Sequence, residues 1–412
     1  MSATPDTSAN PVPPASRASA VPHASTMADD VGLYTILGDG ERDGIRPREV
    51  DVGDDELVRM HRELLRIRVI DTRMMLMQRQ GRVGFYGACT GQEAVPIACA
   101  FATRSTDWIF PALREQAIML VRGFPLTTFI AQVFGNSGDV LKGRQMPSHM
   151  SGKSVQQVSW SSVIGPQIPH AVGAAWAAKL TKKDDVTLGF CGDGATSEPD
   201  FHAAMTFAGV HQTPSVIVCQ NNHWSISVPT ARQTASQTIA IKGRAYGVPG
   251  LRVDGNDILA VREVVLGAVE RARKGDGPSF VEAVTYRIGA HSSSDDPTRY
   301  RSDDEVKFWQ KKDPIERFHK YLVARGLTTD ARRAEIEAEV DAEVLAAIKE
   351  VEPLPPPSRE SLFDDVYGEL PWHLREQRAL LLRTPPAAAH GALPQAAAHG
   401  ALPTAPDTKE GH

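Results

Sequence analysis

Cysteine is scarce in this chain. The 412 residues contain four cysteines, none in Cys-x-x-Cys spacing and most within apolar stretches. This pattern predicts reduced cysteines that pack inside an intracellular protein, and it gives no support for a catalytic cysteine. The four are Cys89, Cys99, Cys191 and Cys219.

Long apolar runs and an excess of positive charge are also missing. No apolar run approaches the ~20 residues that a membrane-spanning helix needs, so we expect no transmembrane segment and no membrane partner. The formal net charge of −5 argues against nucleic acid as the main partner. With 42% hydrophobic residues, the chain is long enough to form one large core or two modest ones.

Both ends of the chain lack apolar periodicity. The N-terminal region has no apolar core of a secretory signal, and its single early arginine, Arg17, with several aspartates argues against a mitochondrial transit peptide. Near the other end, the stretch AAAHGALP occurs twice. We therefore expect a mostly disordered tail over 1–50, one domain over 51–383, and a disordered low-complexity tail over 384–412. A cytoplasmic, bacterial-type location is favoured over the mitochondrial matrix.

Two apolar segments in the middle of the chain end in polar signatures. Val186–Phe190 predicts a buried strand that runs into Gly192-Asp193-Gly194. One βαβ unit later, Ser215–Cys219 predicts a second buried strand that runs into Asn221-Asn222. Because a right-handed βαβ crossover makes such strands parallel, Asp193 and Asn222 should emerge at the same edge of the sheet, where open α/β sheets bind ligands.

These residue types suit a magnesium ion and phosphate groups. Mg²⁺ prefers oxygen ligands, and a carboxylate with an amide oxygen and backbone carbonyls can provide them. Gly192 and Gly194 would let the backbone approach the phosphates closely. This spacing is the signature of thiamine-diphosphate sites.

Two other interpretations stay open at this point. The Gly-Asp-Gly stretch could simply form a tight turn between a strand and a helix. A nicotinamide dinucleotide site is a second alternative, but Ser197 stands where the third glycine of Gly-x-Gly-x-x-Gly should be, and no acidic residue clearly ends the second strand.

Periodicity and capping residues predict the remaining elements. Thr90 should cap a helix through Ala102, with Glu93 at the capping-box position, and Ser197 should cap a helix that has Pro199 in its first turn. Further helices are expected at Asp54–Gln80, Pro125–Phe134, Ile168–Lys179, Ile258–Lys274, Pro314–Gly326 and Asp330–Glu350. Short strands are expected within Thr106–Pro111, Leu251–Val253 and Ser279–Arg287, and a long polar loop over Ile288–Asp304. The alternation of strands and helices predicts a doubly wound, mainly parallel α/β fold with helical additions at both ends.

From about Asp54 to Arg378, the chain resembles the α subunit of thiamine-diphosphate-dependent 2-oxoacid dehydrogenase components that decarboxylate their substrate. Besides the thiamine signature, the likeness includes the stretches KGRQMP, QIPHAVGAA, LRVDGND and TYRIGAHSSSDDPTRYR. The pair Asp295-Asp296, together with KGRQMP, is similar to the branched-chain type rather than the pyruvate type. The resemblance implies the thiamine-diphosphate-binding fold.

The resemblance also implies roles for individual residues. Asp193, Asn222 and the main-chain carbonyl of Trp224 match the Mg²⁺ ligands. Ser162 matches a serine near the reacting end of the cofactor, and His291 a histidine beside the diphosphate, so both are candidate catalytic residues. The implied cofactor-binding residues are Leu113, Arg114, Ser162, Gly192, Gly194, Ala195, Gln220 and His291.

The chain departs from the family pattern at several positions. Leu113 stands where branched-chain members carry an aromatic residue, and Gln220 where they often carry arginine. In the loop that matches a K⁺ site of animal members, Pro166 replaces a hydroxyl ligand, which disfavours K⁺ binding. Ser292 and Ser294 lie in the region that is phosphorylated in mitochondrial relatives.

The implied reaction is oxidative decarboxylation of a branched-chain 2-oxoacid, with transfer of the acyl group to a lipoyl group on a transacylase core. The family's activating glutamate is expected on a separate β subunit, in an assembly of two α and two β chains. An α subunit acting on pyruvate or acetoin is the first alternative, and a nicotinamide-dependent dehydrogenase the second.

Overall fold

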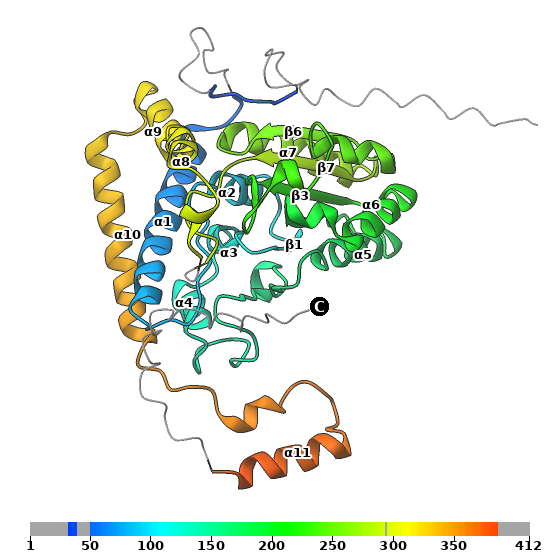
Figure 1. Cartoon of the computed structure of the whole chain (residues 1–412), viewed down its shortest axis with the longest axis vertical. Helices are drawn as coiled ribbons and strands as arrows, with labels where there is room; N and C mark the ends of the chain where they lie inside the picture. Colours follow the sequence, from blue (N-terminus) through cyan, green and yellow to red (C-terminus); the bar gives the residue numbers. More distant parts are fainter. Residues whose placement is uncertain (1–31, 39–49, 293–294, 386–412) are drawn as a thin grey trace, which may run out of the picture.

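A parallel β-sheet forms the centre of the molecule (Figure 1). The computed structural model describes residues 32–38, 50–292 and 295–385. Every neighbouring pair of strands in the five-stranded order β1-β2-β3-β7-β6 is parallel, which confirms the predicted mainly parallel α/β fold. The strands are β1 (Trp108–Phe110), β2 (Thr187–Gly192), β3 (Ser215–Asn221), β7 (Ser279–Val284) and β6 (Gly250–Asp254).

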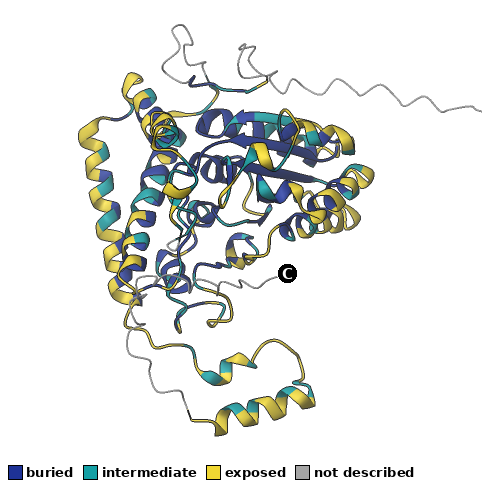
Figure 2. Cartoon of the chain, viewed as in Figure 1, coloured by how far each residue is buried: buried dark blue, intermediate teal, exposed yellow. Residues whose placement is uncertain are grey.

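Helices cover both faces of this sheet, so the predicted double winding is present. Successive side chains of a strand point to opposite faces. On β3, Val216 and Val218 join the larger apolar cluster with helices α2 (Ala94–Phe101) and α7 (Ile258–Arg273). Ile217 and Cys219 join the second cluster, with α5 (Gln167–Leu180) and α6 (Pro199–His211). Strand β3 and its neighbour β7 are therefore buried on both sides, as the dark ribbons in the centre of Figure 2 show.

The other long helices form a layer beside the sheet. In Figure 1, α1 (Asp54–Arg79) and α10 (Asp330–Val351) run side by side at the left, and both contribute side chains to the larger apolar cluster. This layer also includes α3 (Gln116–Val121), α4 (Leu126–Phe134) and α9 (Pro314–Ala324). None of the described helices is long and apolar enough to cross a membrane.

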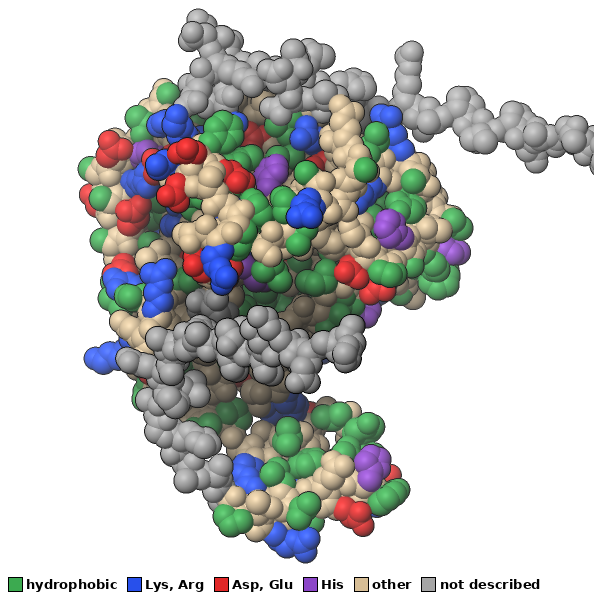
Figure 3. Space-filling view, in the orientation of Figure 1, with side chains coloured by type: hydrophobic (Ala, Val, Ile, Leu, Met, Phe, Trp, Pro, Cys, Tyr) green, Lys and Arg blue, Asp and Glu red, His purple; other side chains and the backbone are tan. Residues whose placement is uncertain are grey.

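A C-terminal arm, residues 353–385, extends away from this body. It ends in helix α11 (Trp372–Arg383), which has no buried residue and lies at the bottom of Figure 1. Apolar side chains remain exposed on the arm, as the green atoms in the lower part of Figure 3 show, among them Leu362, Tyr367 and Trp372.

The predicted helix starts are only partly correct. Asp257 caps α7 by accepting a hydrogen bond from the amide of Ala260, and Pro199 occupies the first turn of α6. The predicted caps Thr90 and Ser197 are wrong. The α2 helix starts after Glu93 instead, and the Ser197 hydroxyl donates to the carbonyl of Gln233 at 3.2 Å.

Tertiary contacts explain why Glu93 does not form the predicted capping box with Thr90. Its carboxylate accepts from the amide of Gly91 at 2.8 Å and also binds the guanidinium of Arg68 on α1. A long-range ion pair therefore determines the orientation of the side chain that the local pattern assigned to a capping box.

Two further segments differ from expectation. Helix α8 (Asp303–Gln310) begins within the polar segment predicted as a loop, capped by Ser302, whose hydroxyl accepts from the amide of Glu305. Residues 32–38 lie inside the range predicted as mostly disordered, yet Tyr34 forms a parallel bridge with Val253 of β6, and Ile36 is buried. Of the tails expected over 1–50 and 384–412, residues 1–31, 39–49 and 386–412 lie outside the described residues.

Candidate active site at the carboxyl edge of the sheet

The carboxyl ends of β2 and β3 lie side by side, as the βαβ pattern predicts. In the parallel register Gly192 pairs with Gln220, so Asp193 directly follows one partner and the asparagine pair follows the other. The hydroxyl of Thr230 lies 3.2 Å from a carboxylate oxygen of Asp193 and 3.2 Å from the side-chain oxygen of Asn221. This contact holds the two strand ends together.

Asp193 is a buried carboxylate with neutral hydrogen-bond donors. Its side chain accepts from the amide of Gln233 at 2.6 Å and from the hydroxyl of Thr230, and the residue is 2% exposed. Burial raises the pKa of Asp193 above its usual range. Because a buried carboxylate is stabilised by a nearby positive charge, a cation at this position would offset the cost of burial.

The oxygens around Asn222 suit the same cation. The Asn222 amide donates to Gln92 at 3.0 Å, and its side-chain oxygen faces the backbone amide of Trp224 at 3.2 Å. The carbonyl of Trp224 accepts from Arg287 at 3.2 Å. In the described part of the chain no group of three or more His, Cys, Asp or Glu side chains is placed to hold a metal. One carboxylate, one amide oxygen and one carbonyl instead fit the oxygen ligation of Mg²⁺.

The two glycines of the signature have different surroundings. A Cβ atom on Gly194 would lie 2.3 Å from the hydroxyl oxygen of Ser225, so this glycine admits the short strand β4 (Trp224–Ser225), which pairs with β5 (Val228–Pro229). A Cβ atom on Gly192 would meet nothing within 4 Å, so the space beside it is open. The methyl group of Ala195 is buried in the second apolar cluster, which leaves its backbone as the part that a ligand could reach.

A cluster of basic side chains lies beyond β7. Arg114 and Arg287 are 5% and 1% exposed, and His291 lies between them. The guanidinium of Arg114 donates to the carbonyl of His291 at 2.9 Å and to that of Ala88. The His291 Nδ1 atom lies 3.4 Å from a guanidinium nitrogen of Arg287. The structure thus brings two predicted residues, Arg114 and His291, together around Arg287.

Among the described residues, Arg114 and Arg287 form no ion pair, and the carboxylates of Glu115 and Asp295 offset their charge only in part. Burial and the nearby Arg287 lower the pKa of Arg114 to about 10. Burial, followed by the charges of Arg114 and Arg287, lowers the pKa of His291 to about 4. These shifts indicate that the cations repel one another in a dry environment, and a bound anion would relieve that repulsion.

Arg287 connects the cluster to the candidate cation site. Besides the carbonyl of Trp224, its guanidinium donates to the carbonyl of Ile226 at 2.7 Å and to the hydroxyl of Tyr300 at 2.8 Å. The Tyr300 hydroxyl in turn donates to Asp295, which also accepts from the amide of His291. Arg287 therefore lies between the candidate cation site and the basic cluster, a position that depends on the fold.

Ser162 lies in an exposed loop and has a partner that the sequence analysis missed. Its hydroxyl contacts Nε2 of His149, which is 3% exposed. Nδ1 of His149 lies 3.2 Å from the carbonyl of Pro147 and is the donor there, so in a neutral ring Nε2 accepts from the serine hydroxyl. The local sequence around His149 gives no signal of this contact.

Glu115 is a second residue that the sequence analysis missed. One carboxylate oxygen accepts from the backbone amides of Ala112 and Arg114, at 2.7 and 3.1 Å, and the other accepts from Gln220. The predicted contact residue Leu113 lies on the same turn, with its side chain against Gly87. The only sequence signal of Glu115 is its position next to Arg114.

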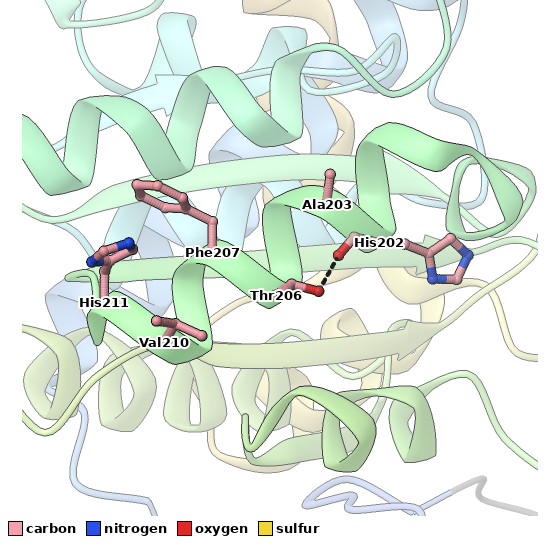
Figure 4. Close-up of a pocket in the computed structure, with 6 residues that line it drawn as sticks. All are labelled: His202, Ala203, Thr206, Phe207, Val210 and His211. Carbon is pink, nitrogen blue, oxygen red and sulfur yellow. Dashed lines mark hydrogen bonds between the residues drawn. The ribbon is translucent and has the colours of Figure 1, made fainter.

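A separate shallow depression on the outer side of α6 contains none of these residues. Figure 4 shows that it follows one side of the helix from His202 to His211. The dashed line marks a bond within the helix, from the hydroxyl of Thr206 to the carbonyl of His202 at 2.8 Å. The depression therefore lies away from the polar groups at the carboxyl edge.

Comparisons with known proteins agree with this geometry. Residues 61–360 match the family described as "Dehydrogenase E1 component". The chain is 40% identical to the 3-methyl-2-oxobutanoate dehydrogenase subunit alpha of Mycobacterium tuberculosis, over 87% of this chain and 96% of the relative. It is 39% identical to the human mitochondrial 2-oxoisovalerate dehydrogenase subunit alpha, over 86% of this chain and 80% of the relative.

A pyruvate-type relative matches less of the chain. The pyruvate dehydrogenase E1 component subunit alpha of Staphylococcus epidermidis is 39% identical over 79% of this chain and 86% of its own length. The family match spans both the candidate cation site and the basic cluster, from Arg114 through the strand ends to His291. The chain therefore belongs to the dehydrogenase E1 component family.

Proposed function

We propose that this chain is the α subunit of a branched-chain 2-oxoacid dehydrogenase, which acts as a 3-methyl-2-oxobutanoate dehydrogenase (2-methylpropanoyl-transferring, EC 1.2.4.4). One observation carries the proposal: Arg287 contacts both the Trp224 carbonyl beside the candidate cation site and His291 in the basic cluster. A site for a divalent cation thus adjoins a site for an anion, which is the arrangement that a magnesium–diphosphate group requires.

The family depends on thiamine diphosphate, and the residues here fit that cofactor and Mg²⁺. Asp193, Asn222 and the carbonyl of Trp224 would hold the metal, while Arg114 and His291 would hold the diphosphate. When bound, thiamine diphosphate supplies an electron sink for the decarboxylation of a 2-oxoacid.

The chain's own residues would bind and orient the cofactor. The planar fork of Arg114 suits two phosphate oxygens, and its burial strengthens the attraction because water screens it little. His291 is neutral near pH 7, so one ring nitrogen can donate a hydrogen bond to an oxygen while the other accepts. Ser162, held by His149, can offer its hydroxyl near the reacting end of the cofactor.

Subunits of this kind act with a β subunit and a transacylase core. We infer an assembly of two α and two β chains, with the activating glutamate on β and a lipoyl group of the transacylase as the acyl acceptor. The exposed apolar side chains of the C-terminal arm provide surface that such an assembly can bury. Bacterial and mitochondrial relatives both exist, and we propose a cytoplasmic location for this chain.

The decisive experiment is reconstitution. We expect the purified α chain alone to be inactive, and co-expression with its β chain to restore decarboxylation measured with an artificial electron acceptor. Turnover efficiency should be higher with 3-methyl-2-oxobutanoate than with pyruvate or acetoin. Decarboxylation by the α chain alone would contradict the proposal that this chain provides only part of the active site. A preference for pyruvate or acetoin would assign the protein to that alternative class. Nicotinamide instead of thiamine in the purified complex would contradict the cofactor assignment.

A further inference from the structure

Glu115 is a buried carboxylate that the proposed mechanism does not use. It is 1% exposed and lies in the turn between β1 and α3. Three donors converge on it: the backbone amides of Ala112 and Arg114 and the side-chain amide of Gln220. The turn that carries Arg114 is therefore held to the end of β3 through this one carboxylate.

The surroundings of Glu115 make it sensitive to charge. The titratable groups beside it are the guanidinium of Arg114 on the same turn and the thiol of Cys99 on α2, which burial keeps neutral. Burial raises the pKa of Glu115 to about 7, against the opposing effect of the two backbone amides and Arg114. Without bound ligand, the carboxyl group is therefore partly ionised at neutral pH.

Gln220 can form a hydrogen bond with Glu115 in either protonation state. Its amide nitrogen donates to the carboxylate, and its side-chain oxygen is buried with no hydrogen-bond partner among the described residues. A rotation of the amide by about 180° would exchange donor and acceptor, so the oxygen could accept from a protonated carboxyl group. An arginine or lysine at position 220 has no hydrogen-bond acceptor, so it could pair only with the ionised form of Glu115.

We propose that Glu115 is a positioning residue for Arg114 and that its ionised form takes up a proton from solvent as the diphosphate group binds. This inference rests on the proposed function, because it requires the diphosphate at Arg114. The diphosphate group is negative, and Mg²⁺ offsets only part of that charge, so the end of the cofactor that would meet Arg114 stays negative. It engages the guanidinium that stabilises the ionised carboxylate. Both effects favour the neutral form of Glu115. The affinity for the cofactor should then fall as pH rises through neutrality.

Isothermal titration calorimetry on the assembled α–β complex tests the proton uptake. Mg²⁺–thiamine diphosphate is titrated into the cofactor-free complex at pH 7.5, in buffers that differ in ionisation enthalpy. The dependence of the observed heat on that enthalpy gives the number of protons taken up. About three quarters of Glu115 is ionised at pH 7.5 if its pKa is about 7, so we expect uptake of roughly half a proton or more.

Two variants separate charge from shape. In Glu115→Gln the side-chain oxygen can still accept from the turn amides, so binding should persist, but the uptake should fall by the amount assigned to Glu115. The affinity of the wild type should fall several-fold from pH 6.5 to 8.5 relative to this variant. Glu270→Gln, an exposed change on α7, is the matched control and should behave like the wild type. His291 is present in every protein tested, so its contribution cancels in the comparison.

The outcomes distinguish this inference from the proposed function. A wild-type complex that does not bind Mg²⁺–thiamine diphosphate overturns the proposed function, and the inference with it. A wild-type complex that binds, but with the same uptake and pH dependence as Glu115→Gln, overturns only the role of Glu115. Thermal melting of the Glu115→Gln complex verifies that it is folded and assembled.

Discussion

Arginines serve different purposes in two regions of this molecule. Along the α1–α10 layer, Arg62 forms an ion pair with Glu339 at 2.8 Å, and Arg73 forms one with Asp341, at side chains that are roughly one third to one half exposed. Hydrogen bonds to Asp341 raise the pKa of Arg73. At the carboxyl edge of the sheet, by contrast, Arg114 is buried beside a second arginine, and its pKa is lowered.

The contrast separates an arginine that we propose to bind the cofactor from arginines that form exposed ion pairs. An exposed ion pair contributes about 0–1 kcal/mol and leaves no charge in need of a partner. Buried cations that form no ion pair cost stability, and a bound anion would restore part of that stability. The next experiments are designed to test this comparison, from the largest expected effect to the smallest.

The largest effect should come from Asp193→Ala. Without the only carboxylate among the proposed metal ligands, the affinity for Mg²⁺–thiamine diphosphate should fall on the order of 100-fold or more while the fold remains intact. Calorimetry on the assembled complex measures the affinity, with melting as the test of folding. Asp341→Ala, which removes a carboxylate from the α1–α10 layer, is the control. Unchanged cofactor affinity in Asp193→Ala would contradict the metal assignment.

The next effect compares the two arginines directly. Arg114→Ala should lower cofactor affinity roughly 10- to 100-fold, and Arg114→Lys should recover only part of it, because lysine lacks the planar fork. Arg73→Ala should leave the affinity unchanged and lower stability by less than about 1 kcal/mol. Dissociation constants and denaturant unfolding measure the two quantities. Similar effects of Arg114→Ala and Arg73→Ala on cofactor affinity would contradict the proposal that Arg114, unlike Arg73, binds the cofactor.

The loop over 288–304 should respond to the cofactor, because its Arg, His and Ser groups suit a diphosphate. Its ends are held by Arg301, which donates to the carbonyls of Ile288 and Gly289, and by the contact of Arg114 with His291. We expect limited proteolysis within the loop to slow several-fold when Mg²⁺–thiamine diphosphate is bound. The α1–α10 layer should be cleaved equally in both states. Equal cleavage of the loop with and without cofactor would argue against ordering.

The smallest effect concerns His61, a buried histidine of the helical layer. Burial, followed by the charges of His319 and Arg333, lowers its pKa to about 4. The unfolded chain therefore binds a proton between about pH 6.5 and 4 that the folded protein does not, so this histidine costs stability as pH falls through that range.

His61→Gln should consequently lose less stability than the wild type between pH 7 and 5, by on the order of 1 kcal/mol. Denaturant unfolding at both pH values measures the difference, and cofactor affinity at pH 7 should be unchanged. An identical pH dependence in variant and wild type would show that His61 is not buried in its neutral form.

Several features of the fold were determined by local sequence alone. The apolar strands before Asp193 and Asn222, and the helix between them, predict parallel neighbours with both residues at one edge, because βαβ units have a fixed hand. Helix α7 spans Ile258–Arg273, close to its predicted range, and Asp257 caps it through a contact within one turn. Periodicity likewise predicts α1 and α10 to within a few residues.

Only the tertiary structure determined which side chains meet across those elements. Glu93 pairs with Arg68, Ser162 with His149, and Glu115 with Gln220, each through contacts between residues far apart in sequence. Such pairs depend on how helices and loops pack against the sheet, and neither periodicity nor spacing contains that information. The pKa shifts at the candidate site have the same origin, because burial and neighbouring charges exist only after the chain has folded.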